Sequence, residues 1–300
     1  MNIRIATRGS RLALRQSEIV CQKLRALDPA IHCELVIVRT AGDRNQRDPL
    51  YALGGKGIFV KEIETYLMTG RADLAVHSMK DLPSAQPAGL CLADAWEGED
   101  PRDALVLREG ISEQQLRARP CIIGTGSLRR MAQLKRLYPE VNCVNLRGNV
   151  ETRLARMEEQ GLDGVVLAAA GLKRLGLHAR ITRCFAEDEM IPAPAQGMLA
   201  LECREDDHVL RALLRRCSDE AARRKMFMER GFLKAMQADC HQPVAACLRQ
   251  HGRQLSFHCM WGNDLSHVAY TQVEGSCGNE AELLKMAVER IERQVRAWEK

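Results

Sequence analysis

The sequence predicts an α/β protein made of two doubly wound domains followed by a small α/β C-terminal domain with an antiparallel sheet. Two observations predict this fold class. Up to residue 204, short apolar runs alternate with amphipathic helical patterns, which is typical of open sheets covered by helices. After residue 250 the apolar residues alternate strictly, as in Leu255, Phe257 and Cys259, which is typical of antiparallel strands.

The composition argues against several classes of protein. A chain of 300 residues can form two or three domains of ordinary size. No apolar run approaches the roughly 20 residues of a membrane span, and the N-terminus lacks the apolar core of a signal peptide. We therefore expect a cytoplasmic protein without membrane contacts. A net charge of +5 and an aromatic content of 4% argue against nucleic acid as a partner.

The twelve cysteines are scattered singly and form no Cys-x-x-Cys pair, so the spacing does not predict a zinc ribbon. Most are expected to be small buried hydrophobic residues. A zinc site is an alternative in the last third of the chain, because suitable residue types gather there. These residues are Cys240, His241, Cys247, His251, His258 and Cys259. Their spacings match no closed structural site, so we expect no metal.

The first strand, helix and turn place two polar residues together. Ile3 and Ile5 predict a strand, and Ala13, Val20 and Leu24 lie on one face of the following helix. The turn between them, at residues 6–10, contains Arg8 and Ser10. A helix N-terminus beside a guanidinium is suited to an anion. Equally, Ser10 is a helix N-cap and Arg8 a solvated side chain.

The next stretch predicts a strand at residues 33–40, buried on both faces because its residues are almost continuously apolar. A long loop follows and ends in Gly54, Gly55, Lys56 and Gly57. Its glycines allow close approach of a ligand that Lys56 would reach, although the loop lacks the P-loop pattern. A hinge or a lid is an equally good interpretation.

Residues 72–83 predict a buried strand with polar residues at its carboxyl end, the place where open α/β sheets bind ligands. Lys80 and Asp81 are candidates there for acid–base chemistry or for stabilising a cation. The alternative is a local surface ion pair. His77 by itself indicates a structural histidine.

A second series of strands and helices follows the charged stretch at residues 97–106, which we interpret as a hinge. Its strands fall near residues 121–124, 143–147 and 164–168. Five arginines lie at or just after their carboxyl ends, namely Arg129, Arg130, Arg147, Arg153 and Arg174. Because those ends share one edge of a doubly wound sheet, the pattern predicts a cationic cleft for carboxylates or phosphates. Each arginine by itself is compatible with a solvated helix position.

The last part of the chain first returns to the first domain and then forms the third domain. Residues 191–204 contain two prolines and a strand, which predicts the return crossing. Residues 226–247 predict a helix, a break and then Cys240, with Pro243 close behind. A cysteine just past a helix end presents its thiol as a nucleophile. The final helix, with Leu284, Val288 and Ile291 on one stripe, is expected to cover the antiparallel sheet.

Taken together, these stretches closely resemble the porphobilinogen deaminase (hydroxymethylbilane synthase) family over nearly the whole chain. The matching motifs are IATRGS, GGKGIFVKE, ADLAVHSMKDLP, EDPRDA, GTGSLRR, LRGNVETRL, AAAGLKRLG and AQGMLALECR. The resemblance implies a monomer with three domains, of which the first two look like the halves of type II periplasmic binding proteins. The implied boundaries are 1–96 with 197–216, then 101–193, then 218–300.

The resemblance also implies an activity and a cofactor. In the family, a cysteine holds a dipyrromethane cofactor through a thioether, and the motif match makes that residue Cys240. Four molecules of porphobilinogen are then joined head to tail with loss of ammonia, and hydroxymethylbilane is released by hydrolysis. A buried carboxylate would stabilise the positive charge that develops on a pyrrole nitrogen, and the match makes that residue Asp81.

The remaining site residues come from the same match. Lys80 and Arg8 are implied to act with Asp81 in catalysis. The residues implied to hold the cofactor with Cys240 are Ser10, Lys80, Asp81, Thr125, Ser127, Arg129, Arg130, Arg147 and Arg153. The residues implied to contact the substrate are Arg8, Arg147, Arg153, Arg174, Lys56 and Phe59.

The cysteine loop departs from the family pattern, in which two small residues precede the cysteine and a Gln-Val-Pro-like run follows it. Here Ala238 and Asp239 precede Cys240, and His241 and Gln242 separate it from the proline. An acidic neighbour raises the pKa of a thiol, whereas a protonated histidine lowers it. This departure leaves a second hypothesis open: a catalytically impaired paralogue that acts as a cytoplasmic ligand-binding protein.

Overall fold

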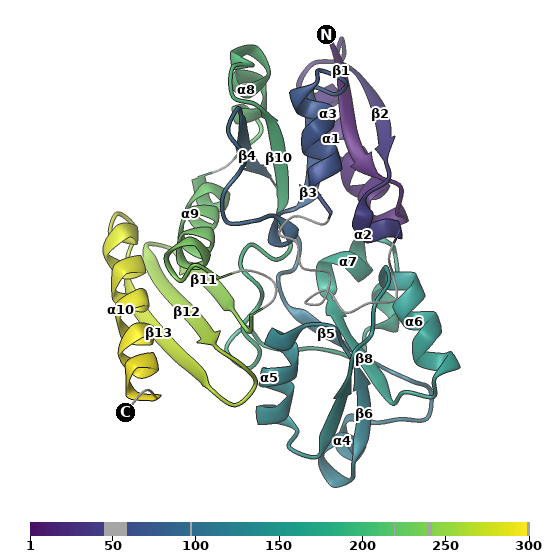
Figure 1. Ribbon diagram of the computed structural model, residues 1–300, viewed down its shortest axis with the longest axis vertical. Helices are drawn as coiled ribbons and strands as arrows, with labels where there is room; N and C mark the ends of the chain where they lie inside the picture. The colour runs from purple at the N-terminus through teal and green to yellow at the C-terminus, as the bar shows by residue number, and fades with distance from the viewer. Residues whose placement is uncertain (45–58, 97, 219, 239–241, 299–300) are drawn as a thin grey trace.

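The computed structural model describes residues 1–44, 59–96, 98–218, 220–238 and 242–298. Figure 1 shows three sheets, each with its own helices: one in the upper part of the view, one in the lower part and one at the side. We call them the first, second and third sheets in chain order. Within the described ranges, no helix has the length and apolar character that crossing a membrane requires.

The first sheet has the strand order β2-β1-β3-β10-β4. Its strands are β1 (Asn2–Arg8), β2 (His32–Val38), β3 (Leu74–Ser78), β4 (Leu90–Trp96) and β10 (Leu199–Arg204). Its helices are α1 (Arg11–Leu27), α2 (Ala41–Arg44), α3 (Lys61–Met68) and α8 (His208–Arg215), with the 3-10 turn η2 (Met79–Asp81) after β3. Apolar clusters on both faces bury the sheet against α1 and α8 on one side and α3 on the other.

The second sheet has the order β7-β6-β8-β5-β9. Its strands are β5 (Asp103–Leu107), β6 (Cys121–Gly124), β7 (Val141–Val144), β8 (Gly164–Ala168) and β9 (Arg183–Cys184). Its helices are α4 (Glu113–Ala118), α5 (Leu128–Leu137), α6 (Val150–Glu159), α7 (Ala169–Arg174) and the 3-10 turn η3 (His178–Arg180). This sheet too has an apolar cluster on each face, as the sequence predicts.

The third sheet has the order β11-β12-β13 and is antiparallel, which confirms the prediction. Its strands are β11 (Ala245–His251), β12 (Gln254–Gly262) and β13 (Val268–Ser276). Helices α9 (Glu220–Ala235) and α10 (Glu280–Trp298) cover one face through a single apolar cluster. On the other face Cys247 and Met260 pack against Ile191.

One expectation about the strands needs correction. The run at residues 33–40 predicts a strand buried on both faces, and this is wrong: β2 lies at the edge of its sheet, and Ile37 is 58% exposed. Each of the first two sheets also contains an antiparallel strand, β10 in the first and β5 in the second. Each of these strands follows directly after the chain crosses between the sheets. It therefore begins at the end of its sheet where the crossings lie, and it runs in the opposite direction to the parallel strands.

Two segments connect the first two sheets. We call residues 98–102 the forward crossing and residues 191–198 the return crossing. They are bonded to each other, since the N–H of Glu99 donates to the carbonyl of Gly197 at 3.2 Å. The return crossing also meets the end of β3, because the N–H of Met79 donates to the carbonyl of Met198 at 3.0 Å. The carboxyl ends of the parallel strands in both sheets therefore lie beside the crossings.

Candidate functional site

The carboxylate of Asp103, the first residue of β5, lies at the centre of the site and is fully buried. Arg129 donates from Nη1 to Oδ2 at 2.5 Å, and Arg130 donates from Nε to Oδ1 at 2.9 Å. Burial acts to raise the pKa of Asp103, but the charges of Arg129 and Arg130 hold that pKa well below its usual range. The carboxylate is therefore ionised and held by two guanidinium groups.

Arg129 and Arg130 are 3% and 4% exposed, so these two of the five predicted cleft arginines lie inside the protein. Their remaining donors reach backbone carbonyls, Arg129 to Ile191 at 2.9 Å and Arg130 to Val166 at 2.9 Å. Arg129 thus ties helix α5 to the return crossing, and Arg130 ties it to β8. Their contact with a ligand carboxylate stays a prediction, and their structural role around Asp103 was not predicted.

Lys80 joins this network from the first sheet. Its Nζ donates to Oε1 of Gln196 at 3.1 Å, and Nε2 of Gln196 donates to Oδ1 of Asp103 at 3.1 Å and to the carbonyl of Pro101 at 2.6 Å. Gln196 is 1% exposed and belongs to the return crossing. One amide side chain therefore connects the lysine at the end of β3 to the carboxylate at the start of β5.

Lys80 also has an altered pKa. Burial lowers the pKa of Lys80 to about 8, and the charge of Arg130 acts in the same direction against Asp81 and Asp103. The ammonium group is therefore poised to lose its proton close to neutral pH, unlike an exposed lysine. A nearby anion would restore the charge.

Arg147 and Arg153 lie on the same side of the second sheet. Arg147 is 7% exposed, and Arg153 donates from Nε to the carbonyl of Gly148 at 2.8 Å. Burial and the charges of Arg130 and Arg147 lower the pKa of Arg153 to about 10, although the charge of Asp81 opposes them. We call Lys80, Arg130, Arg147 and Arg153 the cationic cluster. Its members repel one another, as a site built for anions requires.

Asp81 lies within electrostatic range of three members of this cluster, since its charge raises the pKa values of Lys80, Arg130 and Arg153. The expectation of a buried carboxylate is nevertheless wrong, because the side chain of Asp81 is exposed. The physical reason is the 3-10 turn η2, which carries Asp81 out of the sheet just beyond β3. The described contacts also pair Lys80 with Gln196 in place of Asp81.

The two strand-to-helix turns contain the predicted hydroxyl groups. Ser10 accepts a hydrogen bond from the N–H of Ala13 at 3.3 Å and caps α1. Ser127 accepts one from the N–H of Arg130 at 3.4 Å and caps α5, and its own N–H donates to Oγ1 of buried Thr125 at 3.3 Å. The N-cap interpretation is confirmed, and anion binding by these hydroxyl groups stays a prediction.

The remaining predicted residues are placed as follows. The guanidinium of Arg8 stacks on the ring of Phe59, 4.3 Å from its centroid. Arg174 donates from Nη2 to the carbonyl of Gly197 at 2.6 Å, so it lies at the return crossing. Lys56 and Cys240, two of the predicted residues, lie outside the described residues.

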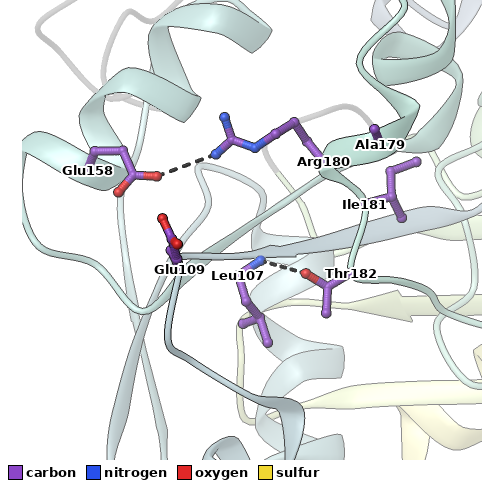
Figure 2. Close-up of a pocket in the computed structure, with 7 residues that line it drawn as sticks. All are labelled: Leu107, Glu109, Glu158, Ala179, Arg180, Ile181 and Thr182. Carbon is purple, nitrogen blue, oxygen red and sulfur yellow. Dashed lines mark hydrogen bonds and ion pairs between the residues drawn. The ribbon is translucent and has the colours of Figure 1, made fainter.

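A pocket of about 450 Å³ is lined by none of these residues, and Figure 2 shows the residues that do line it. It contains the ion pair between Glu158 and Arg180, and Leu107 forms part of its lining. Leu107 pairs with the first residue of β8, whereas Asp103 pairs with the last. The pocket therefore lies at the other end of strands β5 and β8 from Asp103 and does not belong to the site.

The alternative zinc site falls partly outside the described residues, because Cys240 and His241 do so. Among the residues that the structure describes, no group of three or more His, Cys, Asp or Glu side chains could hold a metal ion. Nε2 of His258 lies 2.9 Å from the hydroxyl of Ser256, and Cys247 and Cys259 are fully buried.

Sequence reasoning missed Asp103 and Gln196, although both lie in motifs quoted above. The signal that could have found them is chemical: two adjacent arginines expected at a buried sheet edge require a carboxylate nearby. EDPRDA supplies that carboxylate at the point where the chain enters the second sheet. Nothing local indicates which acidic residue of the motif it is.

Comparisons with known proteins show which family the chain is similar to. Residues 3–212 match the family model described as "Porphobilinogen deaminase, dipyromethane cofactor binding domain". A protein named porphobilinogen deaminase from Lachnospira eligens is 45% identical over 280 residues, covering 92% of this chain and 95% of the relative. Another from Syntrophotalea carbinolica is 50% identical over 244 residues, covering 81% and 77%.

Among solved structures, the periplasmic VFT2 domain of Bordetella pertussis BvgS is similar to 77% of this chain, with 92% of that chain covered, 16% identity and a TM-score of 0.44.

Proposed function

The chain belongs to the porphobilinogen deaminase family, and from this premise we propose that it is a hydroxymethylbilane synthase. As a transferase of this kind, it joins four molecules of porphobilinogen head to tail with release of ammonia and then releases the linear tetrapyrrole by hydrolysis. The polymer grows on a dipyrromethane primer bound as a thioether to Cys240. Porphyrin and heme biosynthesis is the pathway to which this product belongs.

The residues of the site suit such a primer. Each porphobilinogen unit carries an acetate and a propionate, so a dipyrromethane brings several carboxylates. Around Asp103 and Asp81 the structure gathers more cations than these two carboxylates neutralise, namely Lys80, Arg129, Arg130 and Arg153. Because neighbouring guanidinium groups lower the pKa values of Lys80 and Arg153, bound carboxylates would relieve this repulsion. This cationic excess is the observation that carries the proposal.

The residues divide the work in a way that their positions support. Arg147, Arg153 and Lys80 would bind the carboxylates of the primer and of the growing chain, while Asp103 and Gln196 keep Arg130 and Lys80 in place. When bound, the dipyrromethane supplies the pyrrole ring to which the first substrate unit is added. Asp81 would accept the proton of a pyrrole N–H and balance its positive charge, because a carboxylate near a developing cation lowers the barrier.

Arg8 and Phe59 are a second pair of residues that we assign to substrate binding. Their stacking holds the guanidinium at the carboxyl end of β1, and we propose that it contacts the substrate there. Arg174, bonded to the return crossing at Gly197, would contact the substrate from the second sheet. Ser10, Thr125 and Ser127 would add hydroxyl and backbone N–H donors at two helix N-termini.

The experiment that tests the proposal is the denatured intact mass of the purified protein. We expect an excess over the chain mass equal to two linked porphobilinogen units. Cys240→Ser should remove that excess, whereas Cys277→Ser, in the same part of the chain, should keep it. A bare chain mass that does not change on incubation with porphobilinogen would contradict the proposal.

That contrary result would favour the catalytically impaired paralogue. The present findings favour the enzyme, because the similarity to proteins named porphobilinogen deaminase extends over 92% of the chain at 45% identity.

We further propose the three domains 1–96 with 197–216, 101–193 and 218–300, which the three separate sheets support. We also propose a cytoplasmic monomer, in line with the family, and light scattering of the eluted protein tests the monomer.

A further inference from the structure

Five cysteines gather on one apolar cluster of the first sheet, on the face covered by α1 and α8. Cys21 and Cys203 are buried members of this cluster, and Cys33, Cys91 and Cys217 pack against it. None of these five cysteines belongs to the cationic cluster. Their placement is therefore a feature of the chain that the proposed activity leaves unexplained.

Two pairs of these cysteines lie close to each other. Cys91 in β4 and Cys203 in β10 are opposite each other in the antiparallel ladder, and the Cys91 thiol is close enough to raise the pKa of Cys203. Directly opposed residues of antiparallel strands have Cα atoms about 4.5–5.5 Å apart, which lies within the range that a disulfide spans. Cys21 in α1 and Cys33 in β2 belong to the same apolar cluster, and the Cys33 thiol raises the pKa of Cys21.

Each pair joins one buried thiol to one that solvent reaches. Cys203 is fully buried and Cys21 is 6% exposed, whereas Cys91 and Cys33 are partly exposed. A small oxidant would therefore meet Cys91 or Cys33 first and find the second thiol already beside it. This arrangement of an accessible thiol and an adjacent resolving thiol is what disulfide formation requires.

We propose that Cys91–Cys203 and Cys21–Cys33 are oxidisable dithiol sites that form two disulfides when hydrogen peroxide is the oxidant. The Cys91 sulfur attacks one peroxide oxygen, the O–O bond breaks, and a sulfenic acid and one water form. The Cys203 sulfur then attacks the sulfenic sulfur, the S–O bond breaks, and the disulfide and a second water form. The pair loses two electrons, and the peroxide gains them. Cys33 and Cys21 react in the same way.

The reaction is expected to be slow at neutral pH and faster in alkaline solution. Burial and the neighbouring Cys91 thiol raise the pKa of Cys203 to about 12, and burial and the Cys33 thiol raise the pKa of Cys21 to about 12. The buried thiols thus stay protonated at pH 7, and the thiolate is the reactive form. Cys203 also pairs with Leu74, the first residue of β3. Because Lys80 of the cationic cluster follows the other end of β3, the Cys91–Cys203 bond would form away from that cluster.

The test treats the complete protein with hydrogen peroxide at pH 7 and pH 9, alkylates the remaining thiols and maps the peptides without reduction. We expect a 91–203 and a 21–33 linkage, each lowering the mass by two hydrogens, formed faster at pH 9 and reversed by dithiothreitol. Cys91→Ser should abolish the first linkage and leave the second. Cys143→Ser is the matched control, because burial alone raises the pKa of that half-buried thiol, and both linkages should persist in it.

Cys91 recovered as a sulfinic acid with Cys203 alkylated would overturn the proposal, and so would linkages scrambled among the five cysteines. Since this outcome is read from the wild-type protein as well, a variant that folds poorly does not decide the result. The mass excess expected for the primer on Cys240 is a thioether and resists dithiothreitol, so failure of one proposal is distinguishable from failure of the other.

Discussion

The carboxylate of Glu229 accepts a hydrogen bond of 2.6 Å from the backbone N–H of Ala195, which has a φ of 58°. Glu229 belongs to α9 beside the third sheet, and Ala195 belongs to the return crossing. The other carboxylate oxygen accepts from the N–H of Leu248 at 2.9 Å. A non-glycine residue with this φ is strained by roughly 1–2 kcal/mol, so Glu229 holds the crossing in a conformation that it would otherwise leave.

Replacing Glu229 should change how stability depends on pH. Burial raises the pKa of Glu229 to about 7, against an ordinary value of 4.5, although Lys225 and two N–H donors oppose the shift. The folded protein therefore binds this proton more tightly than the unfolded chain does. Stability from this group is fully present below pH 4.5 and is lost as the pH rises to 7. Glu229→Gln should flatten that decline, measured as the free energy of unfolding in urea between pH 5 and pH 8.

The size of the effect is a few kcal/mol at most, because one unit of pKa corresponds to about 1.4 kcal/mol. Glu158→Gln is the control, since Glu158 lies in a half-exposed ion pair with Arg180. A Glu229→Gln protein with the wild-type slope would show that this carboxyl does not titrate in that interval.

Asp103→Asn should strongly destabilise the protein. The substitution removes the charge that two buried guanidinium groups share, and breaking a buried ion pair by removing one partner costs about 3–5 kcal/mol. Urea unfolding measures the loss. The exposed-pair variant Glu158→Gln should cost no more than about 1 kcal/mol. An equal effect of the two substitutions would contradict the central place given to Asp103.

The dependence of kcat/KM on pH should show the titration of Lys80. Its pKa is about 8 with no anion bound, and the carboxylates of a bound primer would raise that pKa, so its positive charge and its attraction for substrate carboxylates are lost only above that pH. For porphobilinogen, kcat/KM should therefore fall above about pH 8. Lys80→Gln should start from a lower value and lack this step, and Lys173→Gln should keep the wild-type profile. A step of wild-type size in Lys80→Gln would assign the titration to another group.

Gly197→Ala should disturb the junction of the two crossings. Gly197 has a φ of +90°, and an added Cβ would lie 2.2 Å from the carbonyl oxygen of Glu99. The backbone there must move, which also displaces the carbonyl that Arg174 binds. We expect a lower melting temperature and a lower kcat for porphobilinogen consumption.

Gly110→Ala is the matched control for this substitution. Gly110 has a similar φ of +81° but open space around its Cβ position, so it should cost only the backbone strain of about 1–2 kcal/mol. If both variants melt at the same temperature, the close approach of Gly197 to Glu99 has no energetic consequence.

Local interactions explain which parts of the site could be predicted. Ser10 caps α1 and Ser127 caps α5 through hydrogen bonds to residues three positions later, so a strand followed by a turn and a helix is readable from adjacent residues. Lys80 at the end of β3 could be placed for the same reason. The exposure of Asp81 could not, because the short 3-10 turn η2 sets the direction of its side chain.

The sequence by itself determined the α/β class, the antiparallel third sheet and the cations at the carboxyl ends of strands, because periodic apolar patterns and turn residues act over a few positions. Only the tertiary structure decided that β2 is an edge strand, that β5 and β10 run antiparallel, and that Asp103 holds Arg129 and Arg130 from 26 and 27 residues away. The same holds for the Cys91–Cys203 contact. The physical reason is that strand order and buried charge pairing depend on which distant segments meet, and the free energy of those contacts has no local signature.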